Sequence, residues 1–282
     1  MDIKKVRLEH VQDYINYLQA EGKSPKTIQN RARLIHTLFD RLRKQQYLER
    51  DHVNPAEDIV LPKGSNKPKL KPYDFDEIKL LTKLVGEYGN PYLTLSVYLG
   101  LYAGLRRSEM ASLTFEDIDF DKKIIHVTKA LVRGEHNKDY LKDTKSRAGI
   151  RDIPVVSELG EVLHKRKVQY NKEKLAHGDE FEDNGYLFSD EYGHRYTVQS
   201  ITHRYQRFQD FAEKRGLRKL NFHFLRHGYA TLLLAANVNL KTAQTLMGHS
   251  SLAMTADLYA DCLASSQQEA GQQLENLLKA HA

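Results

Sequence analysis

Two arginines in this sequence stand in patterns that suit phosphate chemistry. The stretch GLRRSE at residues 104–109 puts Arg106 just after a glycine break, and the stretch HFLRH at residues 223–227 contains Arg226. Guanidinium is the side chain best shaped to hold two phosphate oxygens at once. His223 precedes Arg226 by three residues, so both side chains share one face of an expected helix. Paired arginines are often only solvated surface residues, so the first stretch alone does not decide its role.

The histidines at 223 and 227 also have the spacing of a zinc-binding helix. Such a helix carries Glu directly after its first histidine, and a further ligand completes the metal site. Here Phe224 follows His223, and the sequence shows no convincing third ligand. The pattern therefore disfavours a metal site.

A histidine and a tyrosine follow near the end of the chain. The stretch LMGHSS at residues 246–251 contains His249, and Tyr259 comes ten residues later. A phenol has a pKa near ~10, so it attacks phosphorus only where positive charge or a base helps it to lose its proton. The chain has 16 tyrosines, and most tyrosines only pack. A fourth stretch, TKSRAGIRDIP at residues 144–154, indicates a basic hairpin tip that leads into a buried strand, although a solvated turn also fits it.

Taken together and in this order, the four patterns resemble the signature of the tyrosine recombinase (phage integrase) family. That family has an arginine in a Gly-Leu-Arg-x-Ser-Glu stretch, a lysine on a β-hairpin, His-x-Leu-Arg-His, Leu-Gly-His-Ser-Ser, and a tyrosine about ten residues further on. The resemblance covers nearly the whole chain. It implies a catalytic set of Arg106, Lys145, His223, Arg226, His249 and Tyr259.

The resemblance also implies a reaction. Tyr259 would become linked to a DNA 3′ phosphate, Lys145 would protonate the departing 5′ hydroxyl, and the arginines and histidines would stabilise the charge on the phosphate oxygens. Such chemistry needs no metal and no nucleotide cofactor. Four protomers would act on two double-stranded DNA sites and exchange strands through a Holliday junction.

Some positions depart from the family pattern. Met247 stands where Leu is usual, residues 228–229 where Thr-Phe is common, and residues 235–237 where a glycine is frequent. None of these departures removes a reactive group. Hairpin length varies in the family, and Lys142 lies close to Lys145, so the hairpin lysine is the least firmly assigned member of the set.

The N-terminal region is expected to be a helical, DNA-binding domain. Apolar residues recur at helical spacing from Leu8 to Leu18 and again at Ile28, Leu34, Ile35, Leu38 and Leu42. Residues 1–72 hold 15 Lys/Arg against 9 Asp/Glu, so the whole net charge of +6 lies there. Basic side chains on the second helix and in the following segment are candidate DNA contacts, although plain solvation also fits them: Lys26, Arg31, Arg33, Arg41, Arg43, Lys44, Lys67, Lys69 and Lys71.

The predicted fold is mainly α with a small antiparallel β-sheet. Residues 1–62 form the helical core-binding domain, residues 63–72 a basic linker rich in proline and lysine, and residues 73–282 an α+β catalytic domain. Within the catalytic domain, residues 76–85 and 91–102 are expected to be helices, and residues 123–128 and 150–156 to be strands. A tail helix with Leu274, Leu277 and Leu278 is expected to dock on a neighbouring protomer, or else on its own domain. Some family members have an additional arm-binding domain ahead of the core-binding helices. This sequence begins at the expected core-binding helices.

Composition sets the compartment and limits the alternatives. No apolar run is long enough to cross a bilayer, and the single cysteine, Cys262, excludes an internal disulfide, so we expect a cytoplasmic, nucleoid-associated protein. A DNA-binding accessory protein without activity is disfavoured because Arg106, Arg226 and Tyr259 are all present. A type IB topoisomerase would share the phosphotyrosine chemistry but fits the histidine motifs less well. A metal-dependent nuclease lacks an acidic ligand cluster near the histidines.

Overall fold

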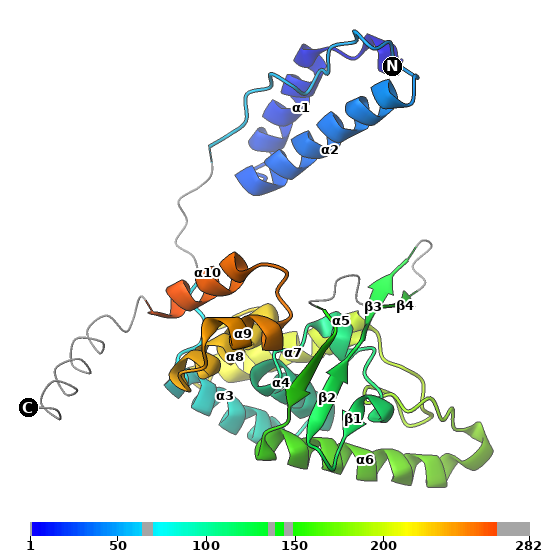
Figure 1. Ribbon diagram of the computed structural model, residues 1–282, viewed down its shortest axis with the longest axis vertical. Coiled ribbons are helices and arrows are strands. Elements are labelled where there is room, and N and C mark those ends of the chain that lie inside the picture. Colours follow the sequence, from blue (N-terminus) through cyan, green and yellow to red (C-terminus); the bar gives the residue numbers. More distant parts are fainter. Residues whose placement is uncertain (1, 64–69, 135–138, 144–148, 264–282) are drawn as a thin grey trace, which may run out of the picture. The chain divides into compact units, whose positions relative to one another are not determined.

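The computed structural model describes residues 2–63, 70–134, 139–143 and 149–263. The chain divides into two compact units, Met1–Leu70 and Lys71–Ala282 (Figure 1). The first unit is helical, as predicted, and consists of a short 3₁₀ turn, η1 (Ile3–Lys5), followed by α1 (Leu8–Ala20) and α2 (Pro25–Lys44). Ser24 caps α2 by accepting a hydrogen bond from the Thr27 backbone, 3.1 Å away, and Pro25 occupies the first helical position.

The buried face of α2 includes only part of its apolar pattern. Ile28, Ala32 and Phe39 are buried, whereas Leu34 and Leu38 are 61% and 47% exposed. The helix is present as predicted, but two residues of its apolar pattern, Leu34 and Leu38, lie outside the core of this unit. Ile28 and Ala32 form a small core with residues of α1, and a single partner helix can bury only one face of α2.

The segment after α2 is fastened back onto that helix by one buried amide. The Asn54 side chain donates to the His36 carbonyl and to Asp40 Oδ1, both at 3.0 Å, and accepts from the Ala56 backbone at 3.0 Å. Asn54 is 1% exposed, so these bonds satisfy a polar group that burial would otherwise destabilise.

The second unit is built around a central helix. Its helices are α3 (Phe75–Tyr88), α4 (Pro91–Tyr102), α5 (Arg107–Met110), α6 (Ser157–His177), α7 (Val198–Glu213), α8 (His223–Ala235), α9 (Leu240–Met247) and α10 (Leu252–Leu263), with 3₁₀ turns η2 (Phe115–Asp117) and η4 (Gly178–Glu180). Helix α4 is apolar around its circumference and packs against α3, α6, α7 and α8 (Figure 1). An all-apolar helix is typical of the centre of a core.

The strands form two small antiparallel sheets. Strands β1 (Ile118–Asp119), β2 (Ile124–Val127) and β5 (Arg151–Pro154) lie in the order β1-β2-β5, with Ile125 opposite Ile153. Strands β3 (Lys129–Arg133) and β4 (Asp139–Asp143) pair with each other in a separate two-stranded sheet and come between β2 and β5 in the sequence. The predicted fold class, mainly helical with small antiparallel sheets, is confirmed. In the sequence, β5 is the next strand after β4 of this two-stranded sheet.

Candidate active site

Arg106 lies at the N-terminal cap of α5 and is held by Glu109. Its backbone N–H donates to Glu109 Oε2 at 2.8 Å, and its Nη1 donates to Glu109 Oε1 at 2.7 Å. Its Nη2 donates to the Gly248 carbonyl at 3.0 Å. The Arg106 side chain is nevertheless 36% exposed, so the guanidinium is fixed while part of it can still meet an anion.

Gly104, two residues before Arg106, allows Tyr229 of α8 to approach closely, and its carbonyl contacts the second arginine. Gly104 has a φ of +60°, and a Cβ there would lie 2.3 Å from Cδ1 of Tyr229. Arg226 Nη1 donates to the Gly104 carbonyl at 2.5 Å, and Arg226 is only 3% exposed. Burial, together with the charges of Arg106 and Arg151, lowers the pKa of Arg226 to about 9, so the group stays charged at neutral pH.

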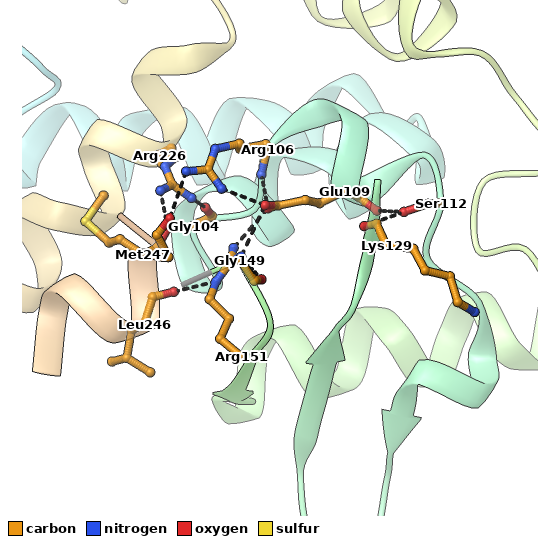
Figure 2. Close-up of polar contacts among 11 residues, drawn as sticks. Gly104, Arg106, Glu109, Ser112, Lys129, Gly149, Arg151, Arg226, Leu246 and Met247 are labelled. Carbon is orange, nitrogen blue, oxygen red and sulfur yellow. Dashed lines mark hydrogen bonds and ion pairs between the residues drawn. The ribbon is translucent and has the colours of Figure 1, made fainter. Parts of the chain in front are cut away.

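Three arginines meet at the C-terminal end of α9. The carbonyls of Leu246 and Met247 accept hydrogen bonds from Arg151 and Arg226 respectively (Figure 2). The Gly248 carbonyl accepts from Arg106. The last carbonyls of a helix have no partner within it and carry partial negative charge. Gly248 is in the left-handed conformation and ends the helix, so consecutive carbonyls turn toward separate guanidinium groups.

His249 follows directly after this helix end. Its backbone N–H donates to the Gln244 carbonyl at 3.1 Å, and its Nδ1 lies 2.9 Å from Thr255 Oγ1 on α10. Burial, followed by the charges of Arg226 and Arg106, lowers the pKa of His249 to about 4. The imidazole is therefore neutral at pH 7, with one ring nitrogen engaged by Thr255.

His223 begins α8 and lies at the edge of the same positive field. Partial desolvation, then the charges of Arg226, Arg106 and Arg107, lower its pKa. The rings of His223 and His227 meet edge to face at 5.0 Å. Among the residues that the structure describes, no group of three or more His, Cys, Asp or Glu is arranged to hold a metal ion.

Tyr259 lies on α10 in a small apolar cluster. It is 7% exposed and packs with residues of α8 and α9, namely Tyr229, Ala230, Leu233, Ala243 and Met247. Its hydroxyl lies 3.5 Å from the Val238 carbonyl, to which it donates. The cluster adjoins the arginine site because the Tyr229 ring also contacts Gly104.

The structure gathers most, but not all, of the predicted set. Arg106, Arg226 and His249 meet at the end of α9, with His223 electrostatically coupled to them. Lys145 lies outside the described residues, as do Lys67, Lys69, Leu274, Leu277 and Leu278. Of the other candidate DNA contacts, Arg43 is half-buried and pairs with Asp40 at 2.9 Å, and the rest are exposed: Lys26, Arg31, Arg33, Arg41, Lys44 and Lys71.

Two buried residues received no role from the sequence. Glu109 and Arg151 both lie within the stretches that carry the resemblance, and the structure pairs them at 2.9 Å with exposed side-chain fractions of 3% and 1%. The available signal was the spacing of Glu109, three residues after Arg106, which is the spacing of a capping box. Nothing in the sequence links Arg151 to Glu109, because the contact joins residues 42 positions apart.

Comparison with known proteins identifies the family of this chain. The model of the phage integrase family matches residues 73–265, which include every predicted catalytic residue. The chain belongs to the phage integrase family. The predicted family is thereby confirmed, and a tyrosine-type site-specific recombinase, which cleaves and rejoins DNA, is the enzyme class of this chain.

Relatives and solved structures agree with this assignment. A XerC-like tyrosine recombinase of Caldanaerobacter subterraneus subsp. tengcongensis is 27% identical over 98% of this chain and 73% of its own. Tyrosine recombinase XerC of Alcanivorax borkumensis is 33% identical over 84% of this chain and 70% of its own. The Tn1549 transposon integrase in complex with a circular intermediate DNA has the same fold, with a TM-score of 0.73 and 23% identity over 95% of this chain and 86% of that chain.

The assignment carries some general properties of recombinases to this chain. Its partner is DNA, and strand cleavage proceeds through the phosphotyrosine chemistry common to the family. In the described part of the chain, no helix has the length and apolarity needed to cross a membrane.

Proposed function

We propose that Tyr259 is the nucleophile of this recombinase. Its Oη attacks the scissile phosphorus and loses its proton, while the bond from phosphorus to the 5′ oxygen breaks. Lys145 protonates the departing 5′ oxygen, and the DNA 3′ phosphate remains esterified to Tyr259. In the reverse direction a 5′ hydroxyl from another strand attacks this ester and releases the tyrosine. Neither direction uses a metal ion or a nucleotide cofactor.

The arginine cluster at the end of α9 is the observation that carries this proposal. Attack on the phosphate builds negative charge on its non-bridging oxygens, and fixed cations aimed at those oxygens lower the barrier. Arg106 and Arg226 are both held by backbone carbonyls, and Arg106 is partly exposed. We assign both arginines to the non-bridging oxygens.

The lowered pKa values of the two histidines suit neutral roles. A neutral His249, with Nδ1 engaged by Thr255, has Nε2 available for a hydrogen bond to the phosphate. A neutral His223 can accept the proton that Tyr259 loses, because a base must be unprotonated before attack. For its own part, Tyr259 must exchange the Val238 carbonyl for the phosphate when DNA binds.

The assembly and the DNA contacts belong to the same proposal. Four protomers would act on two duplexes, with the tail helix of each docking on a neighbour. The exposed basic side chains of α2 would contact the DNA backbone, together with the lysines of residues 63–72.

Trapping on a nicked half-site tests the nucleophile. Wild type and Tyr259→Phe are incubated in chelating buffer with a half-site whose short 5′ strand diffuses away after cleavage, and covalent complexes are separated by denaturing electrophoresis. We expect a shifted band for wild type and none for Tyr259→Phe. A wild type that binds the site and forms no covalent complex would exclude the proposed catalytic role.

A further inference from the structure

The carboxylate of Glu109 lies between two arginines and accepts from both. Oε1 accepts from Arg106 Nη1 at 2.7 Å and from Arg151 Nη1 at 3.1 Å. Oε2 accepts from the Arg106 backbone N–H at 2.8 Å and from Arg151 Nη2 at 2.9 Å. Each oxygen thus has one donor from Arg106 and one from Arg151, and Figure 2 shows the donors of both arginines converging on this carboxylate. This arrangement fixes the carboxylate in position and in rotation.

Arg151 is itself held on every nitrogen. In addition to its two bonds to Glu109, its Nε donates to the Leu246 carbonyl at 2.9 Å and its Nη1 to the Gly149 carbonyl at 3.2 Å. Only 1% of its side chain is exposed. Because every nitrogen of Arg151 already donates to a protein acceptor, this guanidinium is not positioned to bind a DNA phosphate. Any effect of Arg151 on the reaction must therefore pass through the groups that it binds.

The groups that Arg151 binds are those that aim Arg106. Glu109 binds the Arg106 side chain from one side, and the end of α9 binds it from another through the Gly248 carbonyl. Arg151 contacts both supports, Glu109 directly and α9 at Leu246. Burial alone would raise the pKa of Glu109, but the hydrogen bonds and charge of Arg151, with Arg106, lower it to about 2, so the carboxylate is charged whenever the protein is folded near neutral pH.

We propose that Arg151 is a positioning residue for strand cleavage, which acts through Glu109 and the end of α9 to hold Arg106 in place for the scissile phosphate. The inference rests on the proposed role of Arg106. The proposal gives a function to Arg151, the first residue of β5, which is otherwise a short strand of a small sheet. It also explains why a buried ion pair, which is weak evidence for stability, stands in this position.

Single-turnover cleavage of the nicked half-site, with enzyme in excess and above its Kd, tests the proposal. We expect Arg151→Met to cleave about 10²-fold more slowly than wild type, the cost typical of a small misplacement of a catalytic group. DNA affinity, measured separately, should change less than about 3-fold, because Arg151 does not reach the DNA. Arg151→Lys should be intermediate, since an ammonium keeps the charge but cannot bind Glu109 at two points and Leu246 at once.

Arg166→Met is the matched control for burial. Arg166 is likewise buried, with 4% of its side chain exposed, pairs with Glu173 at 2.9 Å and donates to the Leu187 carbonyl at 2.8 Å. It lies on α6 and contacts none of the site residues described above. We expect this variant to lose stability and, when assayed below its melting temperature, to cleave within about 3-fold of wild type. A 10²-fold slower Arg166→Met would overturn the proposal, because loss of any buried ion pair would then suffice.

A double-mutant cycle with Arg106→Ala separates positioning from general damage. If Arg151 acts through Arg106, Arg151→Met should slow the Arg106→Ala enzyme by no more than about 3-fold, since the group it aims is gone. A further loss of about 10²-fold in that background would overturn the proposal. Should Arg151→Met fail to fold, Arg151→Lys takes its place in the cycle with the same criterion. Absence of cleavage by wild type would instead count against the proposed function itself.

Discussion

Arg226 and Tyr259 are both buried on helices of the same unit, yet different contacts hold them. Arg226 donates to two backbone carbonyls, those of Gly104 and Met247, and lies in a network of charged and backbone groups. Tyr259 packs in a small apolar cluster, and its hydroxyl meets the Val238 carbonyl at 3.5 Å, longer than the usual O–H···O distance. The electrostatic half of the site is thus arranged before DNA arrives, whereas the hydrogen bond from the nucleophile's hydroxyl to Val238 is long and therefore easily exchanged.

Removal of one prearranged charge should have the largest effect. We expect Arg226→Lys to slow single-turnover cleavage about 10³-fold, the upper range for loss of a fixed donor in an oxyanion site, because one ammonium cannot reach both carbonyls and the phosphate. Quenched-flow or manual-quench assays on the nicked half-site give the rate. A variant within about 5-fold of wild type would mean that the carbonyl contacts of Arg226 do not aim it at the phosphate.

The lowered pKa of His249 should make the free energy of unfolding depend on pH. His249 has a folded-state pKa of about 4 against an ordinary value of 6.5, so the unfolded chain binds the proton more readily. The stabilisation is complete above pH 6.5 and is lost as the pH falls toward 4, by up to about 3 kcal/mol. Urea unfolding of wild type and His249→Gln at pH 7 and pH 5 measures it. The loss on acidification should be smaller in the variant.

Glu109 does not contribute by titration to the change in stability between pH 7 and pH 5. Its folded-state pKa is about 2 against 4.5, so its contribution is complete above pH 4.5 and is lost below that value. The interval from pH 7 to 5 therefore isolates the histidines. An equal loss in wild type and His249→Gln would show that burial and the charge of the cluster do not lower the pKa of His249.

Gly104→Ala tests the close approach of Tyr229 to the glycine whose carbonyl holds Arg226. The new Cβ would lie 2.3 Å from Tyr229 Cδ1, and the backbone φ of +60° disfavours any residue with a Cβ. We expect a loss of about 2 kcal/mol in unfolding free energy, together with slower cleavage, because the Gly104 carbonyl must shift away from Arg226. The control is Gly86→Ala in α3, where a Cβ would meet nothing within 4 Å and should be neutral or slightly stabilising. Equal unfolding free energies and cleavage rates for the two variants would show that the close approach at Gly104 is not needed.

The sequence predicted the reactive groups better than their supports. The patterns around Arg106, Arg226 and His249 were enough to identify the family, and the limits of α4 were predicted correctly from its apolar run. The pairing of Arg151 with Glu109 could not be predicted, because a long-range contact leaves no periodic signal. The exposure of Leu34 and Leu38 could not be predicted for a related reason, since periodicity shows that a helix has an apolar stripe and not which part of it a partner covers.

The smallest effect should come from the nucleophile's own hydroxyl. Tyr259→Phe keeps the ring in its cluster with Tyr229 and Met247 and removes a hydroxyl whose hydrogen bond to Val238 is long. We therefore expect unfolding free energy to change by less than about 1 kcal/mol, even though the variant forms no covalent complex. Urea unfolding beside wild type at pH 7 measures the difference. A loss above about 2 kcal/mol would mean that the hydroxyl is held as firmly as the arginines, and the contrast between the two halves of the site would fail.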